Sequence, residues 1–188
     1  MCDDFNRKYN EIIEPLYGNR RSVEEDNNLI QSNALPHQYC VSERVDMTSY
    51  DTYSIDPMGC EDADDAFSIF EREDKLFFAL HIADPTEIIN PLSALWKDIE
   101  RRVVTRYPSN MQPIHIIPET IMERASLMEN KHGNIKYAIT ILTEIDYESY
   151  NPCNQVKLLF TRIKVSSENA LSYQRASELF EEGNDTIV

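Results

Sequence analysis

The stretch IDPMGCEDADDA, residues 55–66, gathers carboxylates in one short segment of the chain. Its acidic residues are Asp56, Glu61, Asp62, Asp64 and Asp65. Side chains alternate along an extended backbone, so Asp62 and Asp64 are expected to project to the same side. A proline and a glycine follow Asp56 and supply a bend that can fold it back toward that pair. Several carboxylate oxygens are therefore expected to converge on one point.

Such a gathering of negative charge is unfavourable by itself, because neighbouring carboxylates repel and raise one another's pKa. A divalent cation would remove the conflict. Carboxylates completed by water and phosphate oxygens are the usual ligands of Mg²⁺ or Mn²⁺. The alternative is a solvated acidic loop in an acidic chain. An EF-hand loop is disfavoured, because Phe67 stands where its glycine would be.

Strands are predicted on both sides of the acidic stretch and again near the end of the chain. They are residues 50–56 (YDTYSID), 66–70 (AFSIF), 76–84 (LFFALHIAD), 136–146 and 155–165. EREDK, residues 71–75, is expected to form a charged hairpin turn. The segment 76–84 is so uniformly apolar that we expect a strand buried on both faces.

Helical patterns alternate with these strands. The predicted helices are residues 90–103, 119–129 and 172–182. Asn90 followed by Pro91 is typical of an N-cap with proline in the first turn, and Ser172 is the expected cap of the last helix. The sequence therefore predicts a mixed α/β fold of the α+β type, with a mixed sheet flanked by helices.

The amino-terminal part of the chain differs in character from the rest. Residues 1–45 are polar and their periodicity is broken, so we expect an N-terminal arm with one short helix around residues 9–17. Residues 46–188 are expected to form one folded domain.

Composition limits what the chain can bind. The 188 residues are 41% hydrophobic, which is enough for a core without disulfides. The 18 Lys and Arg against 33 Asp and Glu give a net charge of -15, the wrong sign for gripping a nucleic acid through an overall field. The four cysteines lie far apart, and we find no secretory signal or membrane-spanning stretch. We therefore expect a protein of the reducing cytoplasm with no membrane attachment.

The segment ERVDMTSYDTYSIDPMGCEDADDAFSIF, residues 43–70, resembles the signature of the RNB domain of ribonuclease II and ribonuclease R exoribonucleases. In that signature an aspartate, five residues, an aspartate, one residue and an aspartate pair hold the catalytic metal, and all four positions are filled here. Later blocks are similar to successive elements of the same domain: LFFALHIADPTEII, TRYPSNMQPIHIIP, ERASL, YAITILTEID and TRIKVSSENALSYQRA. The resemblance covers residues 43–180.

The resemblance implies an Mg²⁺-dependent (or Mn²⁺-dependent) exoribonuclease that hydrolyses single-stranded RNA from 3′ to 5′ into nucleoside 5′-monophosphates. Asp56 and Asp65 would be the principal metal ligands, direct or through water, and Asp62 and Asp64 would order the metal shell. Asp64 is assigned the leading catalytic role, because its counterpart in the family matters more for catalysis than for binding.

Tyr107 matches the family's tyrosine near the scissile phosphate, where a ring can stack on the terminal base and a hydroxyl can bond phosphate. The alternative is that Tyr107 has no functional role and is an ordinary tyrosine of the core or of its rim. The neighbouring Arg106 is either a phosphate ligand or a surface arginine. His81 and Asp84 fall in a matched block and are expected to support the fold.

The resemblance also implies an incomplete, amino-terminal part of the RNB domain, whose second half supplies an arginine, a glutamate and another aromatic residue. Such a part should expose apolar surface. We therefore expect either a second polypeptide that completes the domain or self-association. The alternative function is a non-catalytic, truncated RNB module that acts as an RNA- or protein-binding subunit.

Overall fold

The computed structural model describes residues 7–34, 43–60, 62–108 and 112–182, which form two compact units. One unit combines Met1–Cys40 with Thr86–Met122, and the other combines Val41–Pro85 with Glu123–Val188. We call them the helical unit and the sheet unit. The sequence predicts a domain boundary near residue 45. The two compact units do not test this boundary, which stays a prediction.

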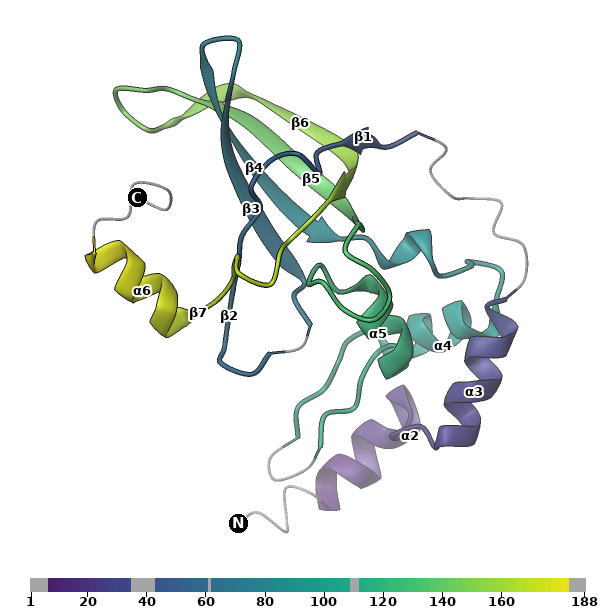
Figure 1. The fold of residues 1–188 in the computed structure, drawn as a ribbon. Coiled ribbons are helices and arrows are strands. Elements are labelled where there is room, and N and C mark those ends of the chain that lie inside the picture. Colours follow the sequence, from purple (N-terminus) through teal and green to yellow (C-terminus); the bar gives the residue numbers. More distant parts are fainter. Residues whose placement is uncertain (1–6, 35–42, 61, 109–111, 183–188) are drawn as a thin grey trace. The chain divides into compact units, whose positions relative to one another are not determined.

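A five-stranded mixed sheet dominates the sheet unit (Figure 1). Its strands are β1 (Val45–Asp46), β3 (Asp65–Arg72), β4 (Lys75–Ala83), β5 (Lys136–Ile145) and β6 (Pro152–Ile163). They lie in the order β1-β6-β5-β4-β3, and all neighbours are antiparallel except β1 and β6. A separate pair joins β2 (Ser54–Asp56) in parallel to β7 (Ala170–Ser172), and helix α6 (Tyr173–Glu181) follows. The predicted α+β class is confirmed.

Local sequence signals explain how these elements are joined. Glu73 and Asp74, in the turn between β3 and β4, have φ values of 54° and 58°, as a two-residue type I′ hairpin turn requires. The predicted charged turn is therefore confirmed. Ser172 caps α6 as predicted, because its Oγ accepts a hydrogen bond from the Arg175 N–H at 3.1 Å.

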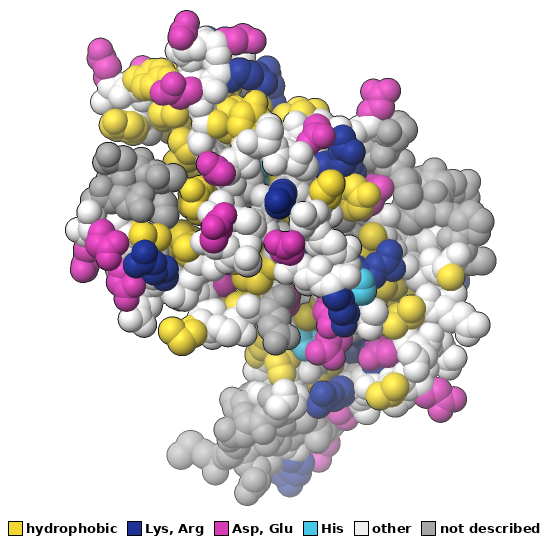
Figure 2. Space-filling model, in the orientation of Figure 1, with side chains coloured by type: hydrophobic (Ala, Val, Ile, Leu, Met, Phe, Trp, Pro, Cys, Tyr) yellow, Lys and Arg dark blue, Asp and Glu magenta, His cyan; other side chains and the backbone are white. Residues whose placement is uncertain are grey.

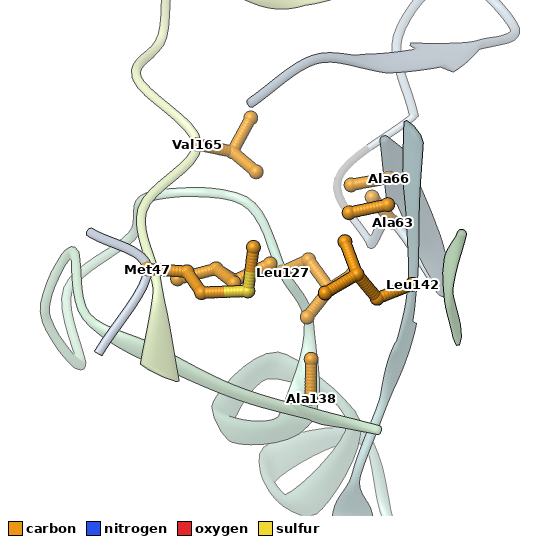
Figure 3. Packing of buried hydrophobic residues seen from close by; sticks show 9 residues of the cluster. Met47, Ala63, Ala66, Leu127, Ala138, Leu142 and Val165 are labelled. Atoms are coloured by element: carbon orange, nitrogen blue, oxygen red, sulfur yellow. The ribbon is translucent and has the colours of Figure 1, made fainter. Parts of the chain in front are cut away.

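The core of the sheet unit lies on one face of the sheet and combines small with large side chains (Figure 3). Leu127 is fully buried there, and Figure 3 shows it between Met47 and Leu142. Ala79 and Ala138 are also fully buried, and their small side chains leave room for Leu127 above the strands. The core therefore depends on alanines at sheet positions that face the large side chains.

The opposite face of the sheet is open. Along β4, His81 is fully buried whereas the next residue, Ile82, is 39% exposed. On β6, Leu158 is 67% exposed. The prediction that residues 76–84 are buried on both faces is therefore wrong: both faces carry apolar residues, but the described part of the chain covers only one of them.

The helical unit contains η1 (Tyr9–Ile13), α2 (Glu14–Tyr17), α3 (Val23–Ser32) and α4 (Ala94–Arg102). The short 3₁₀ turn η2 (Pro85–Glu87) and helix α5 (Glu119–Ala125) each have residues in both units. Helix α3 lies in the predicted arm, where only one short helix was expected, and a capping box of Ser22 and Glu25 begins it.

The start of α4 differs from the prediction. Its cap is Ser93, whose side chain accepts from the Trp96 N–H at 3.1 Å. Asn90 instead holds the preceding turn, because its Oδ1 accepts from the Leu92 N–H at 2.9 Å. The expectation that Asn90 caps this helix is therefore wrong. Within the described ranges, none of the helices combines the length and apolarity needed to cross a membrane.

Candidate metal centre

The segment that carries Asp56 is attached to the start of β3. In β2, Asp56 pairs with Ser172 of β7. Just before β2, Tyr53 and Phe67 exchange two backbone hydrogen bonds of 2.8 Å each. Because β3 begins at Asp65, these bonds place two distant parts of the acidic stretch on adjoining backbone.

A tight turn reverses the chain after Asp56, as the sequence predicts. The Cys60 N–H donates to the Pro57 carbonyl at 3.0 Å, and Gly59 has a φ of 81°. This is the pattern of a type II turn, in which the third residue needs a positive φ. The Cys60 thiol then donates to the Asp62 carbonyl at 3.0 Å. Burial, and then the charges of nearby aspartates, raise the pKa of this thiol, so Cys60 acts as a hydrogen-bond donor rather than a thiolate.

Ala63 anchors the second half of the acidic stretch. Its side chain is fully buried, its N–H donates to the Oγ of Ser126 at 3.1 Å, and its carbonyl accepts from the Leu127 N–H at 2.9 Å. The neighbours of Ala63 on either side, Asp62 and Asp64, are both more exposed than Ala63 itself. Asp62 is half-buried and Asp64 is exposed.

The four aspartates act on one another electrostatically. Burial raises the pKa of Asp56, the nearby Ser54 hydroxyl lowers it, and the negative charges of Asp65 and Asp62 raise it again, so that the net shift is upward. Partial burial likewise raises the pKa of Asp64, followed by the charges of Asp62, Asp65 and Asp56. The structure therefore brings all four predicted ligands into one neighbourhood of mutual repulsion.

One carboxylate oxygen of this group is buried. The Oδ2 of Asp56 has no solvent exposure and no hydrogen-bond partner among the described residues. A buried carboxylate oxygen in this state is costly unless a cation meets it. The donor set, four carboxylates with no sulfur or imidazole ligand, fits a hard divalent cation.

The four aspartate side chains do not converge on a common point. Within the part of the chain that the structure describes, no three His, Cys, Asp or Glu side chains form a group that could hold a metal ion. The backbone thus brings the four aspartates into one region, while their side chains do not converge on one point.

Tyr107 and Arg106 belong to the helical unit, whereas the aspartates belong to the sheet unit. Tyr107 is 76% exposed, which fits a residue that meets a ligand better than a core tyrosine. Arg106 exchanges backbone hydrogen bonds with Ile114, and its Nη2 donates to the Gly18 carbonyl at 2.6 Å. The Arg106 guanidinium is therefore already hydrogen-bonded to the backbone of the helical unit.

His81 and Asp84 have structural contacts, as expected of them. The buried Asp84 carboxylate forms an ion pair of 2.6 Å with the buried guanidinium of Arg44. Both ring nitrogens of His81 lie within hydrogen-bond distance of buried hydroxyls. Sequence reasoning missed Arg44 and Ser126 as supports of this region, since neither carries a spacing or composition signal that links it to the acidic stretch.

A pocket of about 350 Å³ opens beside the turn that follows Asp56. Its lining residues are Cys60, Glu123, Met128, Glu129, Asn130 and Lys131. The Lys131 ammonium pairs with Glu123 at 2.7 Å. Among the described residues, the pocket lies between Cys60 of the turn and the loop after Ser126, and none of the four aspartates lines it.

Comparison with known proteins identifies the family of the chain. The family model described as "RNB domain" matches residues 44–187. The human Exosome complex exonuclease RRP44 is 28% identical over 145 residues, which are 77% of this chain and 14% of the human protein.

Solved structures show the same fold. Mycoplasma genitalium RNase R, solved in complex with double-stranded RNA, has a TM-score of 0.64 at 16% identity, over 100% of this chain and 29% of that one. Yeast Ssd1, described as a pseudonuclease, has a TM-score of 0.63 at 17% identity, over 76% of this chain and 17% of that one. The chain thus spans only a small part of the length of the relatives it matches. Because the family model covers well over half of its residues, the chain belongs to the RNB domain family.

Proposed function

We propose that this chain supplies the aspartate site of an Mg²⁺-dependent (or Mn²⁺-dependent) exoribonuclease of the ribonuclease II type. The reaction would be hydrolysis of single-stranded RNA from 3′ to 5′ into nucleoside 5′-monophosphates. The observation that carries the proposal is the buried, unpartnered Oδ2 of Asp56, in a carboxyl group whose pKa is raised by burial and by Asp65 and Asp62. A cation at this point would relieve both the burial and the repulsion.

Each aspartate then has a separate task. Asp56 and Asp65 would hold the ion, directly or through water, and Asp62 would order its shell. A divalent ion bound there would polarise the scissile phosphate and lower the pKa of an attacking water. Asp64, whose side chain is exposed, would orient that water from the solvent side.

Tyr107 would hold the RNA end. Its exposed ring would stack on the terminal base, and its hydroxyl would donate to a phosphate oxygen. Arg106, the adjacent residue, would add positive charge for the same phosphate while its Nη2 keeps the bond to Gly18. With a net charge of -15, the chain must bind RNA through such local contacts.

The reaction can be tested with the purified chain, 5′-labelled poly(A) and Mg²⁺. We expect stepwise shortening from the 3′ end, release of nucleoside 5′-monophosphates and loss of activity with EDTA. Asp64→Asn should abolish cleavage and leave the fold intact by circular dichroism. Cleavage that persists in this variant would come from another site or a contaminant and would refute the assignment.

The second candidate is a non-catalytic RNB module that binds RNA or protein. The absence of a focused ligand group among the described residues favours it, as does the fold shared with yeast Ssd1, a pseudonuclease. This function predicts binding of labelled poly(A), lost in Tyr107→Ala, with no cleavage at any Mg²⁺ concentration.

We further propose that a second polypeptide segment completes the domain by covering the open face of the sheet. We define this open face by the cross-strand neighbours Phe67, Ile69, Phe78, Leu80, Ile82, Ile139, Ile141, Val156, Leu158 and Phe160. Figure 2 shows hydrophobic side chains gathered toward the hairpin ends of the sheet, at the top of the view. An apolar surface of this kind is typical of an interface.

The open face ends at the candidate metal centre. Asp65 pairs with Ile82, which pairs with Ile139, which pairs with Phe160. A segment that covers this row of side chains would therefore lie next to Asp65 and could add groups to the site. Self-association is the less favoured form, because two copies would each bring a net charge of -15.

Sedimentation of the chain alone across a concentration series separates these forms. A monomer that binds a hydrophobic dye at the open face agrees with a missing partner, and a dimer that dissociates in Leu158→Thr shows self-association. We also propose a location in the reducing cytoplasm, on the ground that the cysteines are widely spaced. Cell fractionation would test it.

A further inference from the structure

Five buried polar side chains form a continuous hydrogen-bonded row through the sheet unit. They are Thr52, Ser68, His81, Thr140 and Thr161, and none is more than 1% exposed. We call them the polar row. Burying a hydroxyl or an imidazole costs folding free energy unless the group is hydrogen-bonded. A completely paired row inside a core therefore specifies how the strands that carry it are arranged.

His81 is the centre of the polar row. Its Nε2 lies 3.0 Å from the Ser68 Oγ, and its Nδ1 lies 2.8 Å from the Thr140 Oγ1. Beyond Ser68, the Oγ1 of Thr52 is 2.9 Å away, and beyond Thr140, the Oγ1 of Thr161 is 2.6 Å away. Side chains from β3, β4, β5 and β6 and from the segment before β2 thus meet in one network.

Each end of the polar row reaches a backbone carbonyl. The hydroxyl of Thr52 lies 3.3 Å from the Tyr50 carbonyl, and that of Thr161 lies 3.3 Å from the Ala138 carbonyl. A hydroxyl has one proton to donate. Burial lowers the pKa of His81 to about 4, so at neutral pH the imidazole is neutral and carries one N–H.

Under these constraints, the hydrogen bonds of the polar row can donate in either of two directions, and each direction corresponds to one tautomer of His81. With the proton on Nδ1, His81 donates to Thr140, the donations end at the Ala138 carbonyl, and Ser68 donates to Nε2. With the proton on Nε2, His81 donates to Ser68, the donations end at the Tyr50 carbonyl, and Thr140 donates to Nδ1. The tautomer of His81 is therefore tied to the orientation of hydroxyls on four other elements.

The polar row also reaches both segments that carry the aspartates. Thr52 lies four residues before Asp56, and Ser68 lies three residues after Asp65. The bond between their hydroxyls runs beside the backbone exchange of Tyr53 and Phe67. His81 therefore connects the two aspartate-bearing segments to the middle strands of the sheet.

We propose that His81 is a positioning residue for the aspartate site, acting through Ser68 and Thr52 on the segments that carry Asp65 and Asp56. Its consequence for metal binding rests on the proposed function. The hydrogen-bond coupling along the polar row is independent of the proposed function. The coupling and the metal affinity are therefore measured separately.

The coupling is tested by the ¹⁵N shifts of the His81 imidazole at pH 7, assigned by comparison with His81→Gln. Thr161→Val and Thr52→Val form a matched pair, since each removes one buried hydroxyl from one end. In Thr161→Val the Thr140 hydroxyl can donate only to Nδ1, so we expect the Nε2–H tautomer. In Thr52→Val the Ser68 hydroxyl can donate only to Nε2, so we expect the Nδ1–H tautomer. The same tautomer in both variants would overturn the coupling.

The positioning role is tested by amide exchange of Tyr53 and Phe67. Thr52→Val and His81→Leu each remove one hydrogen bond of Ser68, so both should speed the exchange about tenfold, whereas Thr161→Val should leave it unchanged. Thr52→Ser should restore the wild-type rate. Unchanged exchange of Tyr53 and Phe67 in His81→Leu would show that His81 does not position these segments and would overturn the proposal.

Mn²⁺ affinity, followed by the EPR signal of free Mn²⁺, then links the row to the site. We expect it to weaken severalfold in Thr52→Val and not in Thr161→Val, with Thr52→Ser behaving as wild type. If the wild-type chain binds no Mn²⁺, the proposed metal function fails while the exchange result still decides the positioning role. Normal Mn²⁺ affinity in Thr52→Val, together with faster exchange, would show that the position of these segments does not control the site and would overturn the link.

Discussion

The N–H of Ala63 donates to the Oγ of Ser126 at 3.1 Å, across 63 residues of sequence. Ala63 is fully buried and Ser126 is 2% exposed. The aspartates on either side of Ala63 therefore take their position from a serine after α5 and not only from their own strand.

Ser126→Ala should lower both stability and metal affinity. The substitution leaves the buried Ala63 N–H without an acceptor, at a cost of about 1–3 kcal/mol. Urea unfolding measures the first effect and Mn²⁺ titration the second. Ser167→Ala, which removes an exposed hydroxyl from the turn before β7, should change stability by no more than about 0.5 kcal/mol. Equal losses in the two variants would mean that the Ser126 bond has no special role.

Asp64→Asn should stabilise the metal-free chain while it removes activity. The pKa of Asp64 is raised by partial burial and by Asp62, Asp65 and Asp56, so its charge opposes folding at pH values above the raised pKa. Solvent screening at this exposed side chain limits the gain to roughly 0.5 kcal/mol. Thermal unfolding in EDTA at pH 7 measures it.

Asp146 provides a control of opposite sign. Hydrogen bonds from the Ser149 side chain and backbone lower the pKa of Asp146, so its charged form favours folding. Asp146→Asn should therefore lower the melting temperature under the same conditions. If Asp64→Asn lowers it as well, repulsion among the four aspartates does not govern the stability of the metal-free chain.

The parts of the fold that sequence predicts are those set by local chemistry. The turn at Glu73 and Asp74 and the cap at Ser172 depend on neighbouring residues, and both were predicted. The open face of β4 was not, because apolar content shows that a strand can be buried and not that a second layer covers it. The cap of α4 is another such case: Asn90 and Ser93 are both good caps, and tertiary packing chooses between them.

In the candidate site, too, the features set by local sequence could be predicted and those set by tertiary contacts could not. The spacing of the four aspartates and the bend after Asp56 can be read from one short stretch. The attachments of that stretch cannot, because Ser126, Ser172 and Thr52 reach it through folding and leave no periodic signal. Whether the carboxylates focus on one point depends on their charges and on a cation, and neither is a property of spacing.

Stability should fall as pH falls from 7.5 to 5, because His81 is buried in neutral form. Its pKa is lowered from 6.5 to about 4, so in this window the unfolded chain binds a proton that the folded chain does not. The contribution of neutral His81 to the free energy of unfolding is complete above pH 6.5 and decreases toward pH 4. Between pH 7.5 and 5 the decrease is about 2 kcal/mol. Guanidinium unfolding at several pH values measures the slope.

His81→Gln removes the titrating group and serves as the comparison. The variant should be less stable at pH 7.5 but should lose the part of the slope between pH 6.5 and 5 that His81 provides. Parallel curves for the two proteins would show that the slope comes from carboxylates elsewhere.

Leu127 and Leu158 should respond very differently to truncation, because one lies in the core and the other on the open face. Leu127 is fully buried among alanines, so Leu127→Ala should cost about 2–5 kcal/mol, from the lost burial of the removed atoms and from the cavity left behind. Leu158 is 67% exposed, so Leu158→Ala should cost about 1 kcal/mol or less in the isolated chain. Urea unfolding of both variants gives the comparison. A partner segment bound to the open face would bury Leu158 and raise its cost toward that of Leu127, whereas a large cost in the chain alone would show that the face is already covered in solution.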